Sequence, residues 1–120
     1  MGLTVLVVED HAESADGLAE LLRLWGHRVH VAYDGETALP IVREVRPDVA
    51  LIDIGLPAMD GNALAAEIRG LEIGRRMLLV ALTGYCDTGV VCPDFDRHFE
   101  KPVVLDVLER LLDERAARSA

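Results

Sequence analysis

Residues 49–61, VALIDIGLPAMDG, contain the most informative position of this chain. The first four residues form a continuous apolar run, which is typical of a strand covered on both faces of a sheet. Asp53 ends the run, and four turn-forming residues follow it: Gly55, Pro57, Asp60 and Gly61. The stretch therefore predicts a buried strand whose last side chain is a carboxylate that opens into a turn-rich loop.

Three other strand-like runs also end in polar residues. The runs and the residues that follow them are 3–8 with Glu9-Asp10, 77–82 with Thr83, and 98–100 with Lys101. Two acidic positions, a hydroxyl and an amine thus stand at strand ends. Residues 28–32 alternate between polar and apolar types, as do residues 98–100, and this alternation predicts partly exposed strands at the edges of a sheet.

Helical periodicity fills the segments between the runs. An apolar stripe after the first run predicts a helix that stops at Gly26. The next helix contains Pro40, which is tolerated in the first turn, so we expect this helix to begin near Thr37. The remaining segments are helices around residues 64–68 and 104–112, and a polar tail at residues 116–120.

Alternating strands and helices predict an α/β fold with a doubly wound, flavodoxin-like parallel sheet of five strands. With the second and fifth strands at the edges, the expected order is 2-1-3-4-5. Ligands of such sheets bind beyond the carboxyl ends of the strands at the switch point, here between the first and third strands. The polar residues at the strand ends should therefore meet in one crevice. We expect residues 1–120 to be a single domain with its core at about residues 3–115.

Composition argues against several classes of protein. The 120 residues are 51% hydrophobic, which suffices for one core but not for two domains. The net charge is −9 and the basic residues are scattered along the sequence, so we expect no direct binding of nucleic acid. The apolar runs are too short to span a membrane and no export signal is recognisable, so we expect a cytoplasmic protein with reduced cysteines.

The polar residues at the strand ends, taken in order, form a specific signature. It consists of Glu9-Asp10, Asp53 with Pro57 and Asp60-Gly61, Thr83-Gly84, and Lys101-Pro102. With this signature the chain resembles, from Leu3 to about Leu112, the receiver domain of bacterial two-component response regulators. The resemblance implies a phosphoacceptor regulator, rather than an enzyme acting on other molecules, that takes a phosphoryl group onto Asp53. It also implies a histidine kinase or histidine phosphotransfer protein as donor, a downstream protein as target, and slow self-dephosphorylation.

The acidic residues of the signature also indicate a metal. Two carboxylates about 4 Å apart repel by roughly 4 kcal/mol near a protein surface, so a cluster of three needs a cation. Mg²⁺ fits because it prefers oxygen ligands and accepts one or two carboxylates together with waters and phosphate oxygens. Asp10 and Asp53 are the expected direct ligands, and Glu9 acts directly or through water. The resemblance adds the backbone carbonyl of Gly55.

The resemblance assigns further roles around the phosphoryl group. Lys101 would hold one phosphoryl oxygen, and Thr83 would hold another beside the small Gly84. His98 stands three residues before the lysine, where the family usually carries a switch aromatic, so Thr83 and His98 are the expected switch residues. An imidazole titrates near neutrality and is more polar than an aromatic ring, so we expect the switch to be either sensitive to pH or weaker.

One segment departs from the family pattern. Residues 84–100 are about one helical turn shorter than usual, and Gly89 and Pro93 oppose a long helix, so we expect a shortened or irregular fourth helix. Cys86 and Cys92 lie in this segment without a second pair that would complete a zinc site. Two unpaired thiols are the default interpretation, and a regulatory disulfide is the alternative.

Single residues of the signature also have structural interpretations. Asp53 and Glu9-Asp10, each taken alone, would serve as helix caps. His27 and His30 are expected at the surface or on the edge strand. Two functions remain open, namely a phosphoacceptor switch and a pseudo-receiver that binds proteins without phosphorylation. A flavodoxin-like cofactor protein is disfavoured because no Gly/Ser/Thr-rich phosphate loop follows the first strand.

Overall fold

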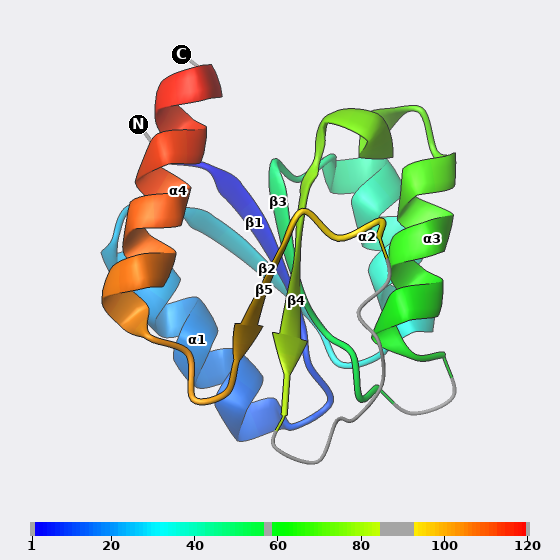
Figure 1. Ribbon diagram of the computed structural model, residues 1–120, viewed down its shortest axis with the longest axis horizontal. Helices are drawn as coiled ribbons and strands as arrows, with labels where there is room; N and C mark the ends of the chain where they lie inside the picture. Colours follow the sequence, from blue (N-terminus) through cyan, green and yellow to red (C-terminus); the bar gives the residue numbers. More distant parts are fainter. Residues whose placement is uncertain (1, 57–58, 85–92, 120) are drawn as a thin grey trace.

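Five parallel strands form the central layer of the protein, in the order β2-β1-β3-β4-β5 (Figure 1). The computed structural model describes residues 2–56, 59–84 and 93–119. The strands are β1 (Thr4–Val8), β2 (Arg28–Ala32), β3 (Val49–Asp53), β4 (Leu78–Thr83) and β5 (Arg97–Glu100). The α/β fold and the strand order predicted from the sequence are confirmed.

Burial separates central strands from edge strands in the way that the sequence pattern predicts. Every residue of β3 is buried, whereas β2 has exposed residues and no residue of β5 is buried. Continuous apolar runs belong in the middle of such a sheet because helices cover both of its faces there.

Helices cover the sheet on both sides (Figure 1). They are α1 (Ala12–Leu24), α2 (Gly35–Val45), α3 (Gly61–Gly70), the 3₁₀ helix η1 (Ile73–Arg76) and α4 (Leu105–Ser119). Side chains of α1 and α4 share one core cluster with the sheet, and side chains of α2 and α3 share the other. Gly26 follows α1 with a φ of +96°, which supports its predicted role as the stop. Residues 116–119, predicted as part of a polar tail, continue α4, and Ala116 packs against the core cluster.

The prediction that the second helix begins near Thr37 is wrong. It begins at Gly35, so Pro40 lies inside the helix and not in its first turn. Asp34 sets the start, because its side chain accepts a hydrogen bond from the N–H of Thr37 (2.7 Å) and caps the helix. Pro40 is tolerated because it and Glu36 are exposed, so water can solvate the carbonyl that the missing N–H leaves unpaired.

The loop after β3 runs directly into α3. Asp60 caps this helix by accepting a hydrogen bond from the N–H of Ala63 (2.8 Å), and Gly61 is its first residue. A Cβ atom on Gly61 would lie 2.5 Å from the Cα of Ile54 and 2.6 Å from the carbonyl oxygen of Asp53. The Asp60-Gly61 pair, predicted as a turn, therefore starts a helix and lets it pack against the end of β3.

His27 is buried, contrary to the expectation that it lies at the surface. The residue is 8% exposed, and Nδ1 of its ring accepts a hydrogen bond from the N–H of Leu3 (3.0 Å). Burial holds the pKa of His27 below its usual range, although the charges of Asp113 and Glu109 on α4 act in the opposite direction. His27 is thus a neutral acceptor that joins the segments before β1 and β2. His30 is exposed, as predicted.

Some predictions concern residues outside the described part of the chain. The expected irregular fourth helix falls largely on residues 85–92, which include Cys86 and Cys92, and Pro57 also lies outside the described residues. None of the described helices has the length and apolar character that crossing a membrane requires.

Replacing Gly61 by alanine should destabilise the fold, because the new methyl group would overlap the backbone at the end of β3. We expect Gly61→Ala to lower the free energy of unfolding by about 1–3 kcal/mol, the usual effect of overpacking. Gly17 provides a matched control, since it is exposed within α1 and an added Cβ meets no atom within 4 Å. Gly17→Ala should raise the same free energy by roughly 0.5–1 kcal/mol. Urea denaturation measures both, and effects of the same sign would contradict the steric argument.

His27 should make stability depend on pH. Its pKa is lower in the folded protein than the ordinary value of 6.5, so the unfolded chain binds a proton more readily. The stabilisation is complete above the unfolded pKa and is lost as the pH falls below it. We expect the free energy of unfolding to fall more steeply between about pH 7.5 and about pH 5.5 in the wild type than in His27→Asn.

Asparagine is the informative substitution because its amide oxygen can accept the hydrogen bond from Leu3 without titrating. Other titrating groups are shared by the two proteins, so only the difference between their curves reports on His27. Parallel curves from urea denaturation across this pH range would show that the buried ring is not responsible.

Candidate functional site

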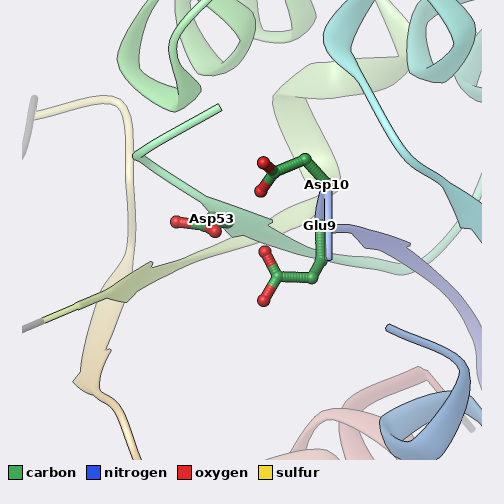
Figure 2. Close-up of side chains that lie close together, drawn as sticks. All are labelled: Glu9, Asp10 and Asp53. Carbon is green, nitrogen blue, oxygen red and sulfur yellow. The ribbon is translucent and has the colours of Figure 1, made fainter. Parts of the chain in front are cut away.

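The carboxyl ends of β1 and β3 bring three acidic side chains together. In the parallel register Val8 pairs with Ile52, so Glu9 follows β1 beside Asp53 at the end of β3. One carboxylate oxygen from each of Glu9, Asp10 and Asp53 lies within 4.8 Å of the other two. Figure 2 shows the carboxyl groups of Glu9 and Asp10 on the side that faces Asp53. The predicted convergence of these residues is what the structure shows.

Lys101 joins this acidic cluster from the other side. Its Nζ donates hydrogen bonds to Oε1 of Glu9 (2.7 Å) and to Oδ2 of Asp53 (3.0 Å). The backbone N–H of Lys101 bonds to the carbonyl oxygen of Thr83 (2.7 Å), which fixes the residue just after β5 against the end of β4. The Lys101–Pro102 peptide bond is cis. Burial opposes the charge of Lys101, but Glu9 and Asp53 outweigh it and raise the pKa of the ammonium group.

Asp53 is a buried carboxylate with a donor on each oxygen. Its residue is 7% exposed, Oδ1 accepts the N–H of Gly55 (2.9 Å), and Oδ2 accepts the ammonium of Lys101. Burial favours the neutral acid, but the contacts with Glu9, Gly55 and Lys101 favour the ionised form and together lower the pKa of Asp53. Asp53 is therefore held as an anion although it is surrounded by protein.

Of the two buried acids, Glu9 retains a proton more readily than Asp53. Burial, followed by the neighbouring Asp53, raises the pKa of Glu9 to about 7, against the opposing effect of Lys101. Within the described part of the chain, its Oε2 atom is buried without a hydrogen-bond partner. A buried carboxylate oxygen without a donor is unfavourable, so this atom is available to a ligand that the protein does not itself supply.

The cluster fits a divalent metal ion. The cluster has three acidic groups and one ammonium group, and among the described residues Oε2 of Glu9 has no hydrogen-bond partner, so a cation bound there could take the place of the proton of Glu9. Asp10 is exposed, which leaves the site open to an ion and its water molecules. Oxygen ligands from carboxylates together with retained waters are the environment that Mg²⁺ prefers. For Gly55 the structure shows the N–H contact with Asp53, and its carbonyl as a metal ligand stays a prediction.

Thr83 and His98 are not part of the acidic cluster. Thr83 is buried at the end of β4, and its hydroxyl donates a hydrogen bond to the carbonyl oxygen of Phe99 (3.3 Å). His98 is an exposed residue of β5 that directly precedes Phe99. The contacts through the N–H of Gly55 and the carbonyl of Phe99 were missed by the sequence analysis, because backbone groups leave no signal in a sequence.

A cavity of about 430 Å³ adjoins the cluster on the side of α1. Glu9 and Lys101 line it together with residues of α1, β4, the segment before α4 and the start of α4. These other lining residues are Ser14, Gly17, Leu18, Leu21, Leu82, Pro102, Val103 and Leu105. A largely apolar hollow beside buried charged groups is a surface on which another protein can dock.

Comparisons with known proteins agree with this geometry. Residues 5–113 match the family described as "Response regulator receiver domain". The chain is 32% identical over 119 residues to the transcriptional regulatory protein ZraR of Salmonella typhimurium, a match that covers 98% of this chain and 27% of ZraR. It is also 32% identical over 118 residues to the sensor histidine kinase RcsC of Salmonella typhimurium, covering 97% of this chain and 12% of RcsC.

One similar solved structure is the receiver domain of the sensor histidine kinase PA1611 from Pseudomonas aeruginosa, with a magnesium ion coordinated in its active site cleft. Its TM-score is 0.84 at 31% identity, and the match covers 95% of this chain and 97% of that one. The chain thus spans only 27% and 12% of the two curated relatives named above, whereas it corresponds to nearly the whole of this solved domain. The chain belongs to the family of response regulator receiver domains, the phosphoacceptor domains of two-component signalling systems.

Proposed function

We propose that Asp53 is the phosphoacceptor of this receiver domain and that the reaction depends on Mg²⁺. The observation that carries the proposal is the geometry of Asp53, a buried carboxylate with Oδ1 accepting the N–H of Gly55 and Oδ2 accepting the Lys101 ammonium. Glu9 takes up the proton of the acidic pair more readily than Asp53 does. The nucleophile therefore stays unprotonated at neutral pH, which covalent chemistry on a carboxylate requires.

The donor in this proposal is a phosphohistidine of a histidine kinase or of a histidine phosphotransfer protein. An Asp53 oxygen attacks the phosphorus atom, a P–O bond forms, and the P–N bond to the imidazole breaks. The electron pair of that bond stays on the imidazole nitrogen, which then takes a proton from the solvent. Lys101 remains an ammonium group throughout and compensates negative charge on the phosphoryl oxygens, and such positioning and neutralisation account for most of phosphoryl-transfer catalysis.

Mg²⁺ would be held by Asp10 and Asp53, with Glu9 binding directly or through water and Gly55 adding its carbonyl. When bound, the ion supplies a positive charge that orients the phosphoryl group and offsets its negative charge. The acidic cluster and the unpaired Oε2 of Glu9 support this assignment, and the PA1611 receiver domain has a magnesium ion in its active site cleft. The same opening that admits a donor admits water, so slow self-dephosphorylation is part of the proposal.

Thr83 and His98 would form the switch. To contact a phosphoryl oxygen on Asp53, the Thr83 hydroxyl must give up its hydrogen bond to the carbonyl of Phe99. That carbonyl belongs to β5, and His98 is the residue before it. The proposed signal is therefore a change at β5 in which His98 leaves its exposed position.

The kinase or phosphotransfer protein is proposed to dock over the cavity between α1 and the segment before α4. Leu18 and Leu21 of α1 offer apolar contacts there, and Glu9 and Lys101 open onto the same cavity. RcsC shows that this type of domain also occurs within a sensor histidine kinase. We further propose that residues 1–120 act as one domain in the cytoplasm and transmit the signal to a protein, without contacting nucleic acid directly.

Phosphoramidate and Mg²⁺ should phosphorylate the wild-type protein once. Intact-mass spectrometry is expected to show the gain of one phosphoryl group, and the modified peptide should contain Asp53. Asp53→Asn should show no gain. Asp60→Asn is the matched control, because asparagine still caps α3 and Asp60 lies outside the cluster. No gain in the wild type, with this donor or with histidine kinases, would support the pseudo-receiver instead.

Mg²⁺ should stabilise the folded protein through the acidic cluster. At a concentration about tenfold above the dissociation constant, one bound ion adds roughly 1.4 kcal/mol to the free energy of unfolding, and a chelator should reverse the effect. Asp10→Asn should abolish the shift in melting temperature, whereas Glu13→Gln removes an exposed acid in the first turn of α1 and should retain it. Equal shifts in both variants would place the ion elsewhere.

A further inference from the structure

A cleft lined by arginines lies at the opposite end of the sheet from the acidic cluster. Its volume is about 560 Å³, and it is bounded by η1, the start of β4, residues 93–96 and the C-terminal end of α4. The acidic cluster stands at the carboxyl ends of the strands, whereas Leu78 in the wall of this cleft is the first residue of β4. Figure 1 shows the C-terminal end of α4 and the start of β4 at the opposite end of the sheet from the arrowheads of the strands, so the two sites are separated by the length of the sheet.

The charge of the cleft is opposite to that of the protein. The chain as a whole has a net charge of −9. The cleft has five arginines and two aspartates in its wall, a local charge of +3. The charged residues of the wall are Arg69, Arg75, Arg76, Arg115, Arg118, Asp94 and Asp96. Such a concentration of one sign of charge in a concave surface attracts ligands of the opposite sign.

Two of the arginines form hydrogen bonds and an ion pair that connect the segments lining the cleft. Arg69 donates to the carbonyl oxygens of Gly74 and Met77 (both 2.7 Å) and pairs with Asp96 (2.6 Å). Asp96 also accepts the N–H of Leu79 (2.9 Å), so this ion pair is tied into the sheet. These contacts neutralise Arg69 and make it a structural residue.

Arg115 is the second of these arginines. It donates to the carbonyl oxygen of Arg76 (2.8 Å) and thereby connects α4, on one face of the sheet, with η1 on the other. Two of the elements that bound the cleft, η1 and α4, are thus fastened to each other, so its rim is not formed by a single flexible loop.

The side chains of the other three arginines do not hold parts of the described structure together. The side chains of Arg75, Arg76 and Arg118 are exposed, and none makes a hydrogen bond or ion pair with the described part of the chain. Two belong to η1 and one to α4, and all three line the same cleft. Like charges gathered in this way repel one another, and an anion between them would remove the repulsion.

We propose that this cleft binds a small, soluble, phosphate-rich anion. Guanidinium groups form paired hydrogen bonds with phosphate oxygens, and three of them can share a ligand that carries several negative charges. The volume lies within the range of small-molecule sites, about 300–1,000 Å³. Met77, Leu78 and Pro93 add an apolar part to the wall, which suits the organic portion of a nucleotide.

A long polyanion fits the cleft less well. Binding a nucleic-acid backbone requires a track of cations, and Asp94 lies in the wall of this cleft while Glu114 lines the smaller hollow beside it. We expect the ligand to contain a chain of phosphates. Both an inorganic polyphosphate and a nucleotide have such a chain. The experiment below separates these two sources.

Isothermal titration of the whole chain with tripolyphosphate and with ADP, at low salt and without divalent metal, tests the proposal. Both compounds should bind if phosphates alone are recognised, with ADP binding more tightly if the apolar wall contacts the base. The double substitution Arg75→Gln and Arg118→Gln should weaken binding by about tenfold, the combined effect expected of exposed charge-assisted contacts. Raising the ionic strength should weaken it further.

Two control variants make the result specific. Arg110→Gln removes one positive charge from an exposed position of α4 outside the cleft and should leave the affinity unchanged. Asp53→Asn should also bind normally, since the acidic cluster lies at the other end of the sheet. Amide chemical-shift changes on binding should centre on η1 and residues 94–97.

Some outcomes would overturn the proposal. These are the absence of binding by either phosphate compound, an equal loss of affinity in Arg110→Gln, or shifts centred on the acidic cluster. Binding of a short polyglutamate peptide without binding of tripolyphosphate would also overturn it, because the cleft would then be a docking surface for protein. None of these results depends on phosphorylation of Asp53.

Discussion

The contact of the Lys101 ammonium with Glu9 and Asp53 is the interaction on which the site depends. Two buried carboxylates at neighbouring strand ends would repel each other strongly without a positive group between them. The ammonium does not remove the excess of negative charge, since Asp10 makes a third carboxylate. The Lys101 ammonium thus holds the acids together, and the cluster still has an excess of negative charge that a cation would offset.

The geometry of a parallel sheet makes this arrangement possible. Parallel strands end at the same edge, so residues far apart in the sequence, such as Glu9 and Lys101, come within hydrogen-bond distance. The packing around the end of β3 then sets the position of Asp53. Gly61 allows α3 to approach the backbone of Asp53 closely, and Gly55 donates its N–H to the carboxylate. A scaffold of buried strands and a close helix keeps the proposed nucleophile in one place, which phosphoryl transfer requires.

The two ends of the sheet carry opposite charge. Acidic groups gather at the carboxyl ends of the strands, and arginines gather at the amino ends, where η1 and α4 are joined through Arg115. The basic residues are scattered along the sequence, and nothing in their spacing indicates that five of them share one cleft. A protein with a net charge of −9 can therefore have a cleft lined by arginines, at a distance from its acidic cluster.

The sequence by itself determined the strands, their order and the residues that meet at their ends, because apolar runs and the polar residues after them are local patterns with few topological solutions. It was wrong about the start of α2 and about His27, since a cap at Asp34 and a hydrogen bond to Leu3 depend on neighbours that periodicity does not report. Only the tertiary structure decided which donors reach each oxygen of Asp53, which oxygen of Glu9 has no partner among the described residues, and which arginines lie together. These are consequences of packing and distance between segments, and a pattern read along one chain contains neither.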